Sequence, residues 1–247
     1  MIDDRAARST DRGMTSGGRQ PDHNLARQLS DMARSLQQAP GLDRTLDAIV
    51  HAAVVNIPGA TYAGISRIDR RRRITTPAAT DPTVRRIDEV QYRTGEGPCL
   101  DAIREQLTVR VDDLRVDPRW PAFAGAAADL GILSMLAVQL YVHADDLGAL
   151  NLYSADAAAF DDRDEQIGLL LASHASIAMI GAEENQQLRA AMTHRDVIGR
   201  AEGILMERHK ITAQQAFGLL VHASQDRNRK LHDIAEEFVT TGVDPAE

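Results

Sequence analysis

Hydrophobic residues recur every three or four positions in two stretches near the N-terminus. One stretch runs from His23 to Leu36 and the other from Leu42 to Val54, and Pro40-Gly41 and Pro58-Gly59 follow them. Such spacing gathers apolar side chains on one face of a helix, and a Pro-Gly pair ends the helix. We therefore predict two helices. Residues 1–22 lack any periodicity, which predicts a disordered tail.

The hydrophobic period then changes to two, which is typical of strands with one buried face. Strands are expected over Tyr62–Ile68, near Ile74, and over Thr108–Val111, Ser134–Tyr141 and Gly148–Tyr153. The polar segments Asp69–Arg73 and His143–Asp146 are expected to form turns. Between the strands, Pro98–Glu105 and Pro118–Leu130 have helical patterns that begin with proline. The fold class predicted for this part is α+β, an antiparallel sheet with flanking helices.

A single long helical pattern runs from Asp161 to His209, with Asp161 or Asp162 as its N-cap. Apolar residues recur at intervals of seven from Leu170, whereas the companion series three positions earlier is mixed. Such a pattern favours an interrupted coiled coil shared across a homodimer. A simple exposed linker helix remains the alternative.

Two shorter helical patterns complete the chain. Thr212 is a suitable N-cap for a helix over Ala213–Ser224, and Gly242 follows a second helix over Leu231–Thr241. The loop between them, Gln225–Lys230, is almost wholly polar. With the end of the long helix, these elements predict an all-α three-helix bundle.

Charge is distributed unevenly along the chain. The net charge is −8, but residues 188–232 contain eight Lys or Arg against four Asp or Glu, which leaves +4 there and −12 elsewhere. A basic segment on an acidic chain indicates an anionic partner, although a solvated basic face gives the same pattern. No apolar run approaches the roughly 20 residues of a membrane-spanning helix. The single cysteine fits a reducing compartment, so a cytoplasmic protein without membrane contact is expected.

Several short motifs in the C-terminal segment occur in a characteristic order. They are Ala201-x-Gly203-Ile204-Leu205-Met206, Ala216-Phe217-x-x-Leu220, Ser224, Asn228-x-Lys230-Leu231 and Ala235. This segment resembles the ANTAR domain of transcription antitermination regulators, of the actinobacterial GAF-ANTAR type. In the family a lysine usually precedes the glycine, and here that position is Glu202. The small residues are expected to let the three helices approach closely, with Leu205, Met206, Phe217 and Leu220 in the centre.

The resemblance implies binding of paired RNA hairpin loops in structured leader transcripts, which requires two copies of the domain. Polar residues outside the expected core are the candidates for RNA contacts, because guanidinium, ammonium and amide groups bind phosphates and exposed base edges. The candidates are Arg195, Arg200, Arg208, Lys210, Ser224, Arg227, Asn228, Arg229, Lys230 and His232. The alternative is a helix-turn-helix that reads DNA, although the long charged connection at Gln225–Lys230 argues against it.

A second set of motifs precedes the long helix. It comprises Gly95-Glu96-Gly97-Pro98-Cys99, Asp117-x-Arg119-Trp120-Pro121-x-Phe123 and Leu147–Tyr153. These motifs resemble a GAF domain, which implies a sensor of a small molecule or of redox state, and Cys99, Trp120 and Phe123 are its candidate pocket residues. Cys99 is either a reactive thiol with a pKa lowered by a helix N-terminus or a buried, inert thiol.

Together these patterns divide the chain into a tail (1–22), a GAF-like sensor (23–181), a helical linker (182–194) and an ANTAR domain (195–247). Nucleophile, phosphate-loop and kinase signatures are absent from the sequence, so no enzyme activity is expected. The histidines lack a dependable metal spacing, so no metal site is expected, and the sequence does not identify a cofactor.

Overall fold

The computed structural model describes residues 30–31, 33–36, 39–68, 73–105, 108–143 and 146–244. The predicted tail over residues 1–22 lies outside the described residues, as do most of the helix predicted from His23, most of the turn predicted over Asp69–Arg73 and the middle of the turn predicted over His143–Asp146. The chain divides into two compact units. One contains Thr45–Ser176, and the other contains Ile177 and the described residues after it.

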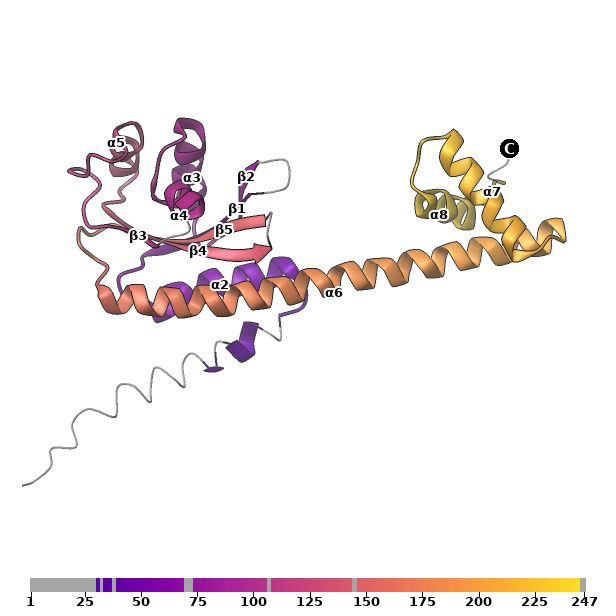
Figure 1. Cartoon of the computed structure of the whole chain (residues 1–247), viewed down its shortest axis with the longest axis horizontal. Helices are drawn as coiled ribbons and strands as arrows, with labels where there is room; N and C mark the ends of the chain where they lie inside the picture. Colours follow the sequence, from indigo (N-terminus) through magenta and orange to yellow (C-terminus); the bar gives the residue numbers. More distant parts are fainter. Residues whose placement is uncertain are drawn as a thin grey trace, which may run out of the picture. The chain divides into compact units, whose positions relative to one another are not determined.

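The first unit is built on a five-stranded antiparallel sheet with the strand order β2-β1-β5-β4-β3 (Figure 1). The strands are β1 (Tyr62–Ile68), β2 (Ile74–Ala79), β3 (Thr108–Val111), β4 (Ser134–His143) and β5 (Asp146–Ser154). The predicted α+β class is confirmed, with two strands longer than expected at their shared turn. Pairing between β4 and β5 continues to the His143–Asp146 pair, beyond the apolar positions that defined the prediction.

Helices cover both faces of this sheet. On one face lie α3 (Pro82–Thr94), α4 (Pro98–Glu105) and α5 (Pro121–Asp129), and on the other lie α2 (Leu42–Asn56) and the first turns of α6 (Asp162–His209) (Figure 1). Side chains of β4 alternate accordingly. Met135 packs in the cluster with residues of α3 and α5, whereas Val138 lies within 3.2 Å of the position where a Cβ on Gly168 of α6 would stand.

Local sequence explains where most of these helices begin. Asp161 accepts hydrogen bonds from the backbone of Arg163 (2.8 Å) and Asp164 (2.9 Å). The sequence offered Asp161 or Asp162 as the N-cap of α6, and these bonds identify Asp161. The helix expected from Pro118 begins instead at Pro121. The carboxylate of Asp117 accepts a hydrogen bond from the backbone of Arg119 (3.0 Å), which holds Pro118 in a turn outside the helix.

The second unit is a bundle of the last part of α6 with α7 (Ala213–Asp226) and α8 (Leu231–Thr241). Thr212 and Gln215 form a capping box at the start of α7, and Gly242 ends α8 in the left-handed conformation. The predicted three-helix bundle is therefore confirmed. Its core contains Ala201, Leu205, Ala216, Leu220, Ala223, Ile234, Ala235 and Phe238.

Three residues that were expected in or against this core are exposed instead. Met206 and Phe217 were predicted in the centre, but 36% and 42% of their surfaces are exposed. Gly203 was expected to permit close helix packing, yet a Cβ at this position would meet no atom within 4 Å. On α6 the side turned toward α7 and α8 carries Ala201 and Leu205, which are fully buried. Residues one or two positions away on the helix therefore point elsewhere.

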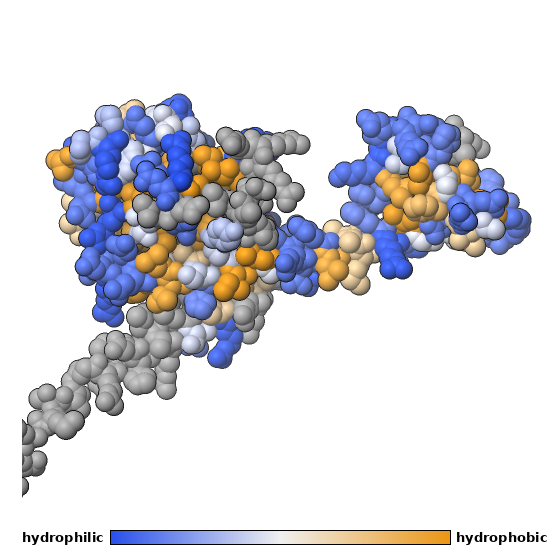
Figure 2. All heavy atoms as spheres, in the orientation of Figure 1, coloured by the Kyte–Doolittle hydropathy of each residue, from blue (hydrophilic) through white to orange (hydrophobic). Residues whose placement is uncertain are grey.

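The apolar residues that recur at intervals of seven on α6 have different surroundings before and within the bundle. Ile198 and Leu205 pack in or against the bundle core, so they are unavailable for a coiled-coil seam. Before the bundle, Ile177, Leu188 and Met192 expose 64%, 61% and 66% of their surfaces. Figure 2 shows apolar atoms at the surface of this stretch of α6.

None of the helices in the described part of the chain combines the length and apolar character needed to cross a membrane.

Candidate nucleic-acid interface

The loop between α7 and α8 is closed by two hydrogen bonds between Ser224 and Arg229. The hydroxyl of Ser224 donates to the carbonyl of Arg229 (2.6 Å), and the backbone N–H of Arg229 donates to the carbonyl of Ser224 (3.0 Å). Asn228 adopts a left-handed conformation, with φ of 47°, which asparagine tolerates better than most residues. Ser224 thus braces the loop, and the side chains of the loop are presented from a fixed backbone.

Cationic side chains of this loop stand at the start of α8. Arg227, Arg229 and Lys230 are all exposed, and Arg229 forms an ion pair with Glu237 on α8. Lys230 is the N-cap of α8, but no side chain caps this end of the helix. The first backbone N–H groups of α8 and the positive end of its dipole therefore lie next to Lys230. This combination favours a negatively charged group, such as a phosphate.

The same end of α8 lies against α6. The imidazole rings of His194 and His232 stack, with ring centroids 3.7 Å apart and planes inclined by 13°. His232 also lies 3.0 Å from a carboxylate oxygen of Asp233. The stack places the turn of α6 that contains Arg195 beside the start of α8. His232 is half-buried, so much of its surface is used within the bundle.

Two other predicted RNA-contacting residues lie at the opposite end of α8. Arg208 donates to the carbonyl of Gly242 (2.9 Å), and its guanidinium group stands 5.3 Å from the centre of the Phe238 ring. Lys210 forms an ion pair with Glu207. Because an eleven-residue helix spans about 16 Å, the predicted residues form two separate groups on the surface.

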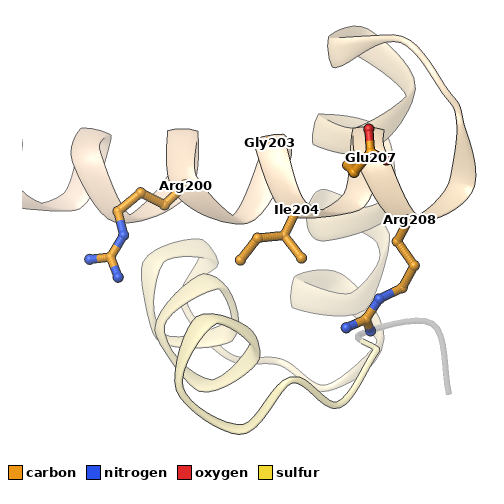
Figure 3. A pocket seen from close by; sticks show the side chains of 5 residues that line it. All are labelled: Arg200, Gly203, Ile204, Glu207 and Arg208. Carbon is orange, nitrogen blue, oxygen red and sulfur yellow. The ribbon is translucent and has the colours of Figure 1, made fainter.

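An open groove lies between these groups on one face of α6 (Figure 3). Its lining residues are Arg200, Gly203, Ile204, Glu207 and Arg208. In Figure 3 the side chain of Ile204 projects from the middle of this face, with the two arginines on either side along the helix. Arg200, predicted only as a phosphate contact, thus lines a concave surface.

In the first unit, a network of buried polar side chains lies between the sheet and α3. Asp88 is fully buried and accepts hydrogen bonds from Tyr153, from Thr76 (2.7 Å) and from Gln91 (3.1 Å). Burial raises the pKa of Asp88 to about 6, although these hydrogen bonds act in the opposite direction. Asn151 adjoins the same network, because its amide donates to the hydroxyl of Ser66 (2.8 Å).

Cys99 borders this network and is fully buried. Desolvation, with the nearby Asp88 carboxylate as a smaller cause, raises the pKa of its thiol to about 12. The suggestion that the start of α4 lowers this pKa is therefore wrong, because burial outweighs the helix dipole. The inert alternative fits, since a thiolate is the reactive form.

The three predicted pocket residues do not line one common cavity. Trp120 and Phe123 belong to the apolar cluster beneath α3 and α5, whereas Cys99 packs in a separate small cluster with Ile103 and Ala149. The indole N–H of Trp120 donates to Asp101 (2.7 Å), and the guanidinium of Arg119 lies 4.1 Å from the ring centre. Trp120 is thus a structural residue that joins α4 to α5.

Close packing against α3 explains a glycine in the motif before α4. Gly97 has φ of 139°, and a Cβ there would stand 2.2 Å from the Oε1 atom of Gln91. The same Oε1 atom accepts a hydrogen bond from the backbone of Cys99 (3.0 Å). Gln91 therefore ties α3 to the first turn of α4, and only glycine fits at the approach. Within the described residues, no three His, Cys, Asp or Glu side chains gather as a metal site requires.

Comparison with protein families now identifies both units. The GAF domain family matches residues 39–179, which is more than half of the chain. The chain belongs to the GAF domain family. The ANTAR domain family matches residues 186–239, so this GAF domain is followed by an ANTAR domain. An ANTAR domain is an RNA-binding domain of transcription antitermination regulators, and the architecture is therefore that of a sensor joined to an RNA-binding output. A search of curated proteins found no match.

Solved structures agree with the GAF fold. A GAF domain of a phosphoenolpyruvate-protein phosphotransferase from Coxiella burnetii is similar, with 16% identity, a TM-score of 0.56 and coverage of 67% of this chain and 98% of that chain. A putative GAF sensor protein from Burkholderia vietnamiensis has 19% identity and a TM-score of 0.52, with coverage of 65% and 96%. The N-acylhomoserine lactone dependent LuxR family factor CepR2 from Burkholderia cenocepacia has 21% identity and a TM-score of 0.51, with coverage of 64% and 96%. At these identities the likeness concerns the fold alone.

Sequence reasoning missed the polar network of the GAF domain. Asp88 lies on the face of α3 that also carries Val84 and Ile87, and Asn151 shares one face of β5 with the buried Ala149 and Tyr153. A polar residue on an otherwise apolar face is the signal that identifies such positions.

Proposed function

We propose that this GAF-ANTAR protein is a signal-responsive transcription antitermination regulator whose C-terminal bundle binds paired hairpin loops of leader RNA. The observation that carries the proposal is the exposed pair Arg227 and Lys230 beside the uncapped start of α8. The family match and the local excess of eight basic over four acidic residues in 188–232 support it. The boundaries proposed for its parts are 23–181 for the sensor, 182–194 for the linker and 195–247 for the RNA-binding domain.

The chemistry of this surface suits a folded-back RNA loop. Ammonium and guanidinium groups bind phosphates, and backbone N–H groups at a helix start bind the same oxygens. A fixed loop loses less conformational entropy on binding than a mobile one, and Ser224 fixes this loop by two hydrogen bonds to Arg229. In the proposed complex Lys230 and Arg227 hold the backbone of the RNA loop, and Asn228 reaches its unpaired bases.

The signal proposed for the GAF domain is a small molecule rather than oxidation of Cys99. The thiol is buried and its pKa is raised to about 12, which disfavours the reactive thiolate. Among the described residues, the buried Oδ1 atom of Asn151 has no hydrogen-bond partner. A buried acceptor without a donor destabilises a fold, and a ligand that brings an N–H or O–H group would satisfy it. We place the protein and its RNA target in the cytoplasm.

Two copies of the protein are proposed to associate along α6, because paired RNA loops need two binding domains. Substitution of Leu188 and Met192 by glutamate is expected to convert a dimer into monomers, since these side chains expose 61% and 66% of their surfaces on an otherwise polar stretch. Sedimentation equilibrium of the full chain measures the change. Gln186→Glu with Gln187→Glu, on the same stretch, is the control and is expected to remain dimeric. An unchanged dimer in the Leu188/Met192 variant would place the interface elsewhere.

The proposed function is tested by offering the full chain a library of RNA hairpins with randomised loops and, in the same assay, duplex DNA of matched length. We expect enrichment of particular hairpins at moderate salt, and competition by these hairpins but not by the DNA. Preference for duplex DNA would favour a helix-turn-helix regulator instead. Failure to enrich any hairpin, even at low salt, would refute the proposal.

A further inference from the structure

The groove on α6 combines an exposed apolar residue with two arginines, and the packing of the bundle does not explain this combination. It is a shallow depression, open to solvent, with a volume of about 680 Å³. Arg200 and Arg208 stand eight residues apart on its lining, which corresponds to about 12 Å along the helix. Ile204, with 37% of its surface exposed, gives the groove an apolar floor between them.

Gly203 keeps this floor open. Glycine destabilises the interior of a helix relative to alanine, so its presence there needs a reason. A Cβ at Gly203 would meet no atom within 4 Å, so the three-helix packing does not require glycine. Its effect is to leave space next to Ile204 on a solvent-facing side of α6.

The two arginines suit a nucleic acid more than a second protein chain. The guanidinium group of Arg208 is held in place by the carbonyl of Gly242 (2.9 Å) and the ring of Phe238. A fixed, planar guanidinium stacks on a base or binds a phosphate with little loss of entropy. Two cations and one acid line the groove, so its charge complements a polyanion.

Glu207 is the acid on this basic face. Its ion pair with Lys210 is exposed to solvent and therefore weak, so the carboxylate can exchange the lysine for a base. A carboxylate accepts hydrogen bonds from the exocyclic amino groups of bases and repels phosphate. We infer that the groove seats one unpaired RNA base that carries an amino group, with Ile204 and Gly203 beneath it, Arg200 and Arg208 on its flanks and Glu207 at its edge. The inference rests on the proposed RNA-binding function and names the base class of one subsite: adenine, guanine or cytosine, in preference to uracil, which lacks an exocyclic amino group and offers only its N3–H.

The substitution Gly203→Leu tests the site, because its Cβ would meet no atom within 4 Å, its side chain occupies space in the groove, and it removes a helix-destabilising residue. Gly218→Leu is the matched control, since Gly218 lies on α7 and is equally open. Against a hairpin enriched by the wild-type chain, we expect Gly203→Leu to weaken binding about tenfold or more and Gly218→Leu to leave it within about twofold. Circular dichroism is expected to show unchanged or greater helix content in both variants.

A second arm tests the base class. Each loop base of the enriched hairpin is replaced in turn by uracil, and one position is expected to weaken wild-type binding about tenfold. In Glu207→Ala the same replacement is expected to have little effect, because the acceptor of the amino group is gone. Undiminished binding by Gly203→Leu, or equal penalties for uracil in wild type and Glu207→Ala, would overturn the subsite while the RNA-binding function stands.

Two further outcomes separate the alternatives. If the wild-type chain enriches no hairpin, the proposed function and this inference both fail. If Gly203→Leu loses RNA only because it no longer self-associates in sedimentation, the groove contacts a second copy of the chain and the base subsite is refuted.

Discussion

Replacing Arg227 and Lys230 together by glutamate is expected to lower the affinity of the full chain for an enriched RNA hairpin by at least about 100-fold. The change removes two positive charges at the start of α8 and adds two negative ones, so attraction to phosphate becomes repulsion. Folding should survive, because both side chains are exposed and a negative charge near a helix N-terminus is favourable. Fluorescence anisotropy with a labelled hairpin measures the affinity.

Salt dependence makes this prediction specific. Each phosphate contact to a single strand contributes about −0.7 to the slope of log K against log salt, so loss of two contacts should reduce the slope by about 1.4. Arg86→Glu with Arg93→Glu, on the exposed side of α3, changes the net charge equally and serves as the control. A similar loss in both variants would mean that only the total charge matters, and the loop would have no special role.

The regular elements of this protein could be predicted because their signals are local. Thr212 and Gly242 bound α7 and α8 as expected, since a capping side chain and a left-handed glycine act within one turn of the chain. The strands follow the alternation of their side chains. Asp161 could not be separated from Asp162 as the N-cap by residue type, because both are good caps and only the backbone hydrogen bonds distinguish them.

The candidate sites depend on contacts between distant segments, and here the sequence was less informative. Gly203 has the same appearance in a sequence whether it faces a neighbouring helix or an open groove. The direction of α6 toward α7 and α8 decides between these, and that direction results from packing of the whole bundle. Likewise, Asp88 finds its partners on β2, β5 and its own helix, which no single window of sequence contains.

The buried carboxyl of Asp88 should make the stability of the GAF domain depend on pH. Its pKa is raised from 3.8 to about 6, so the folded state binds this proton more tightly than the unfolded state. The resulting stability is present below about pH 4 and is lost as pH rises through 6. A shift of this size corresponds to about 3 kcal/mol in the free energy of unfolding between these limits. Asp88→Asn is expected to remove this component, because the amide does not titrate.

Urea unfolding from pH 4 to pH 7.5 measures the effect, and Trp120 provides a local probe because it is the only tryptophan and lies in the GAF core. The informative quantity is the difference in pH slope between the two proteins. The absolute stability of Asp88→Asn also falls, because an amide nitrogen now faces donors such as the Tyr153 hydroxyl. Acids with lowered pKa values, such as Asp81 and Asp117, act in the opposite direction but are common to both proteins.

Asp129→Asn, on the exposed end of α5, should keep the wild-type slope. Parallel pH profiles for wild type and Asp88→Asn would show that Asp88 stays ionised in the folded domain, and that its hydrogen bonds outweigh its burial.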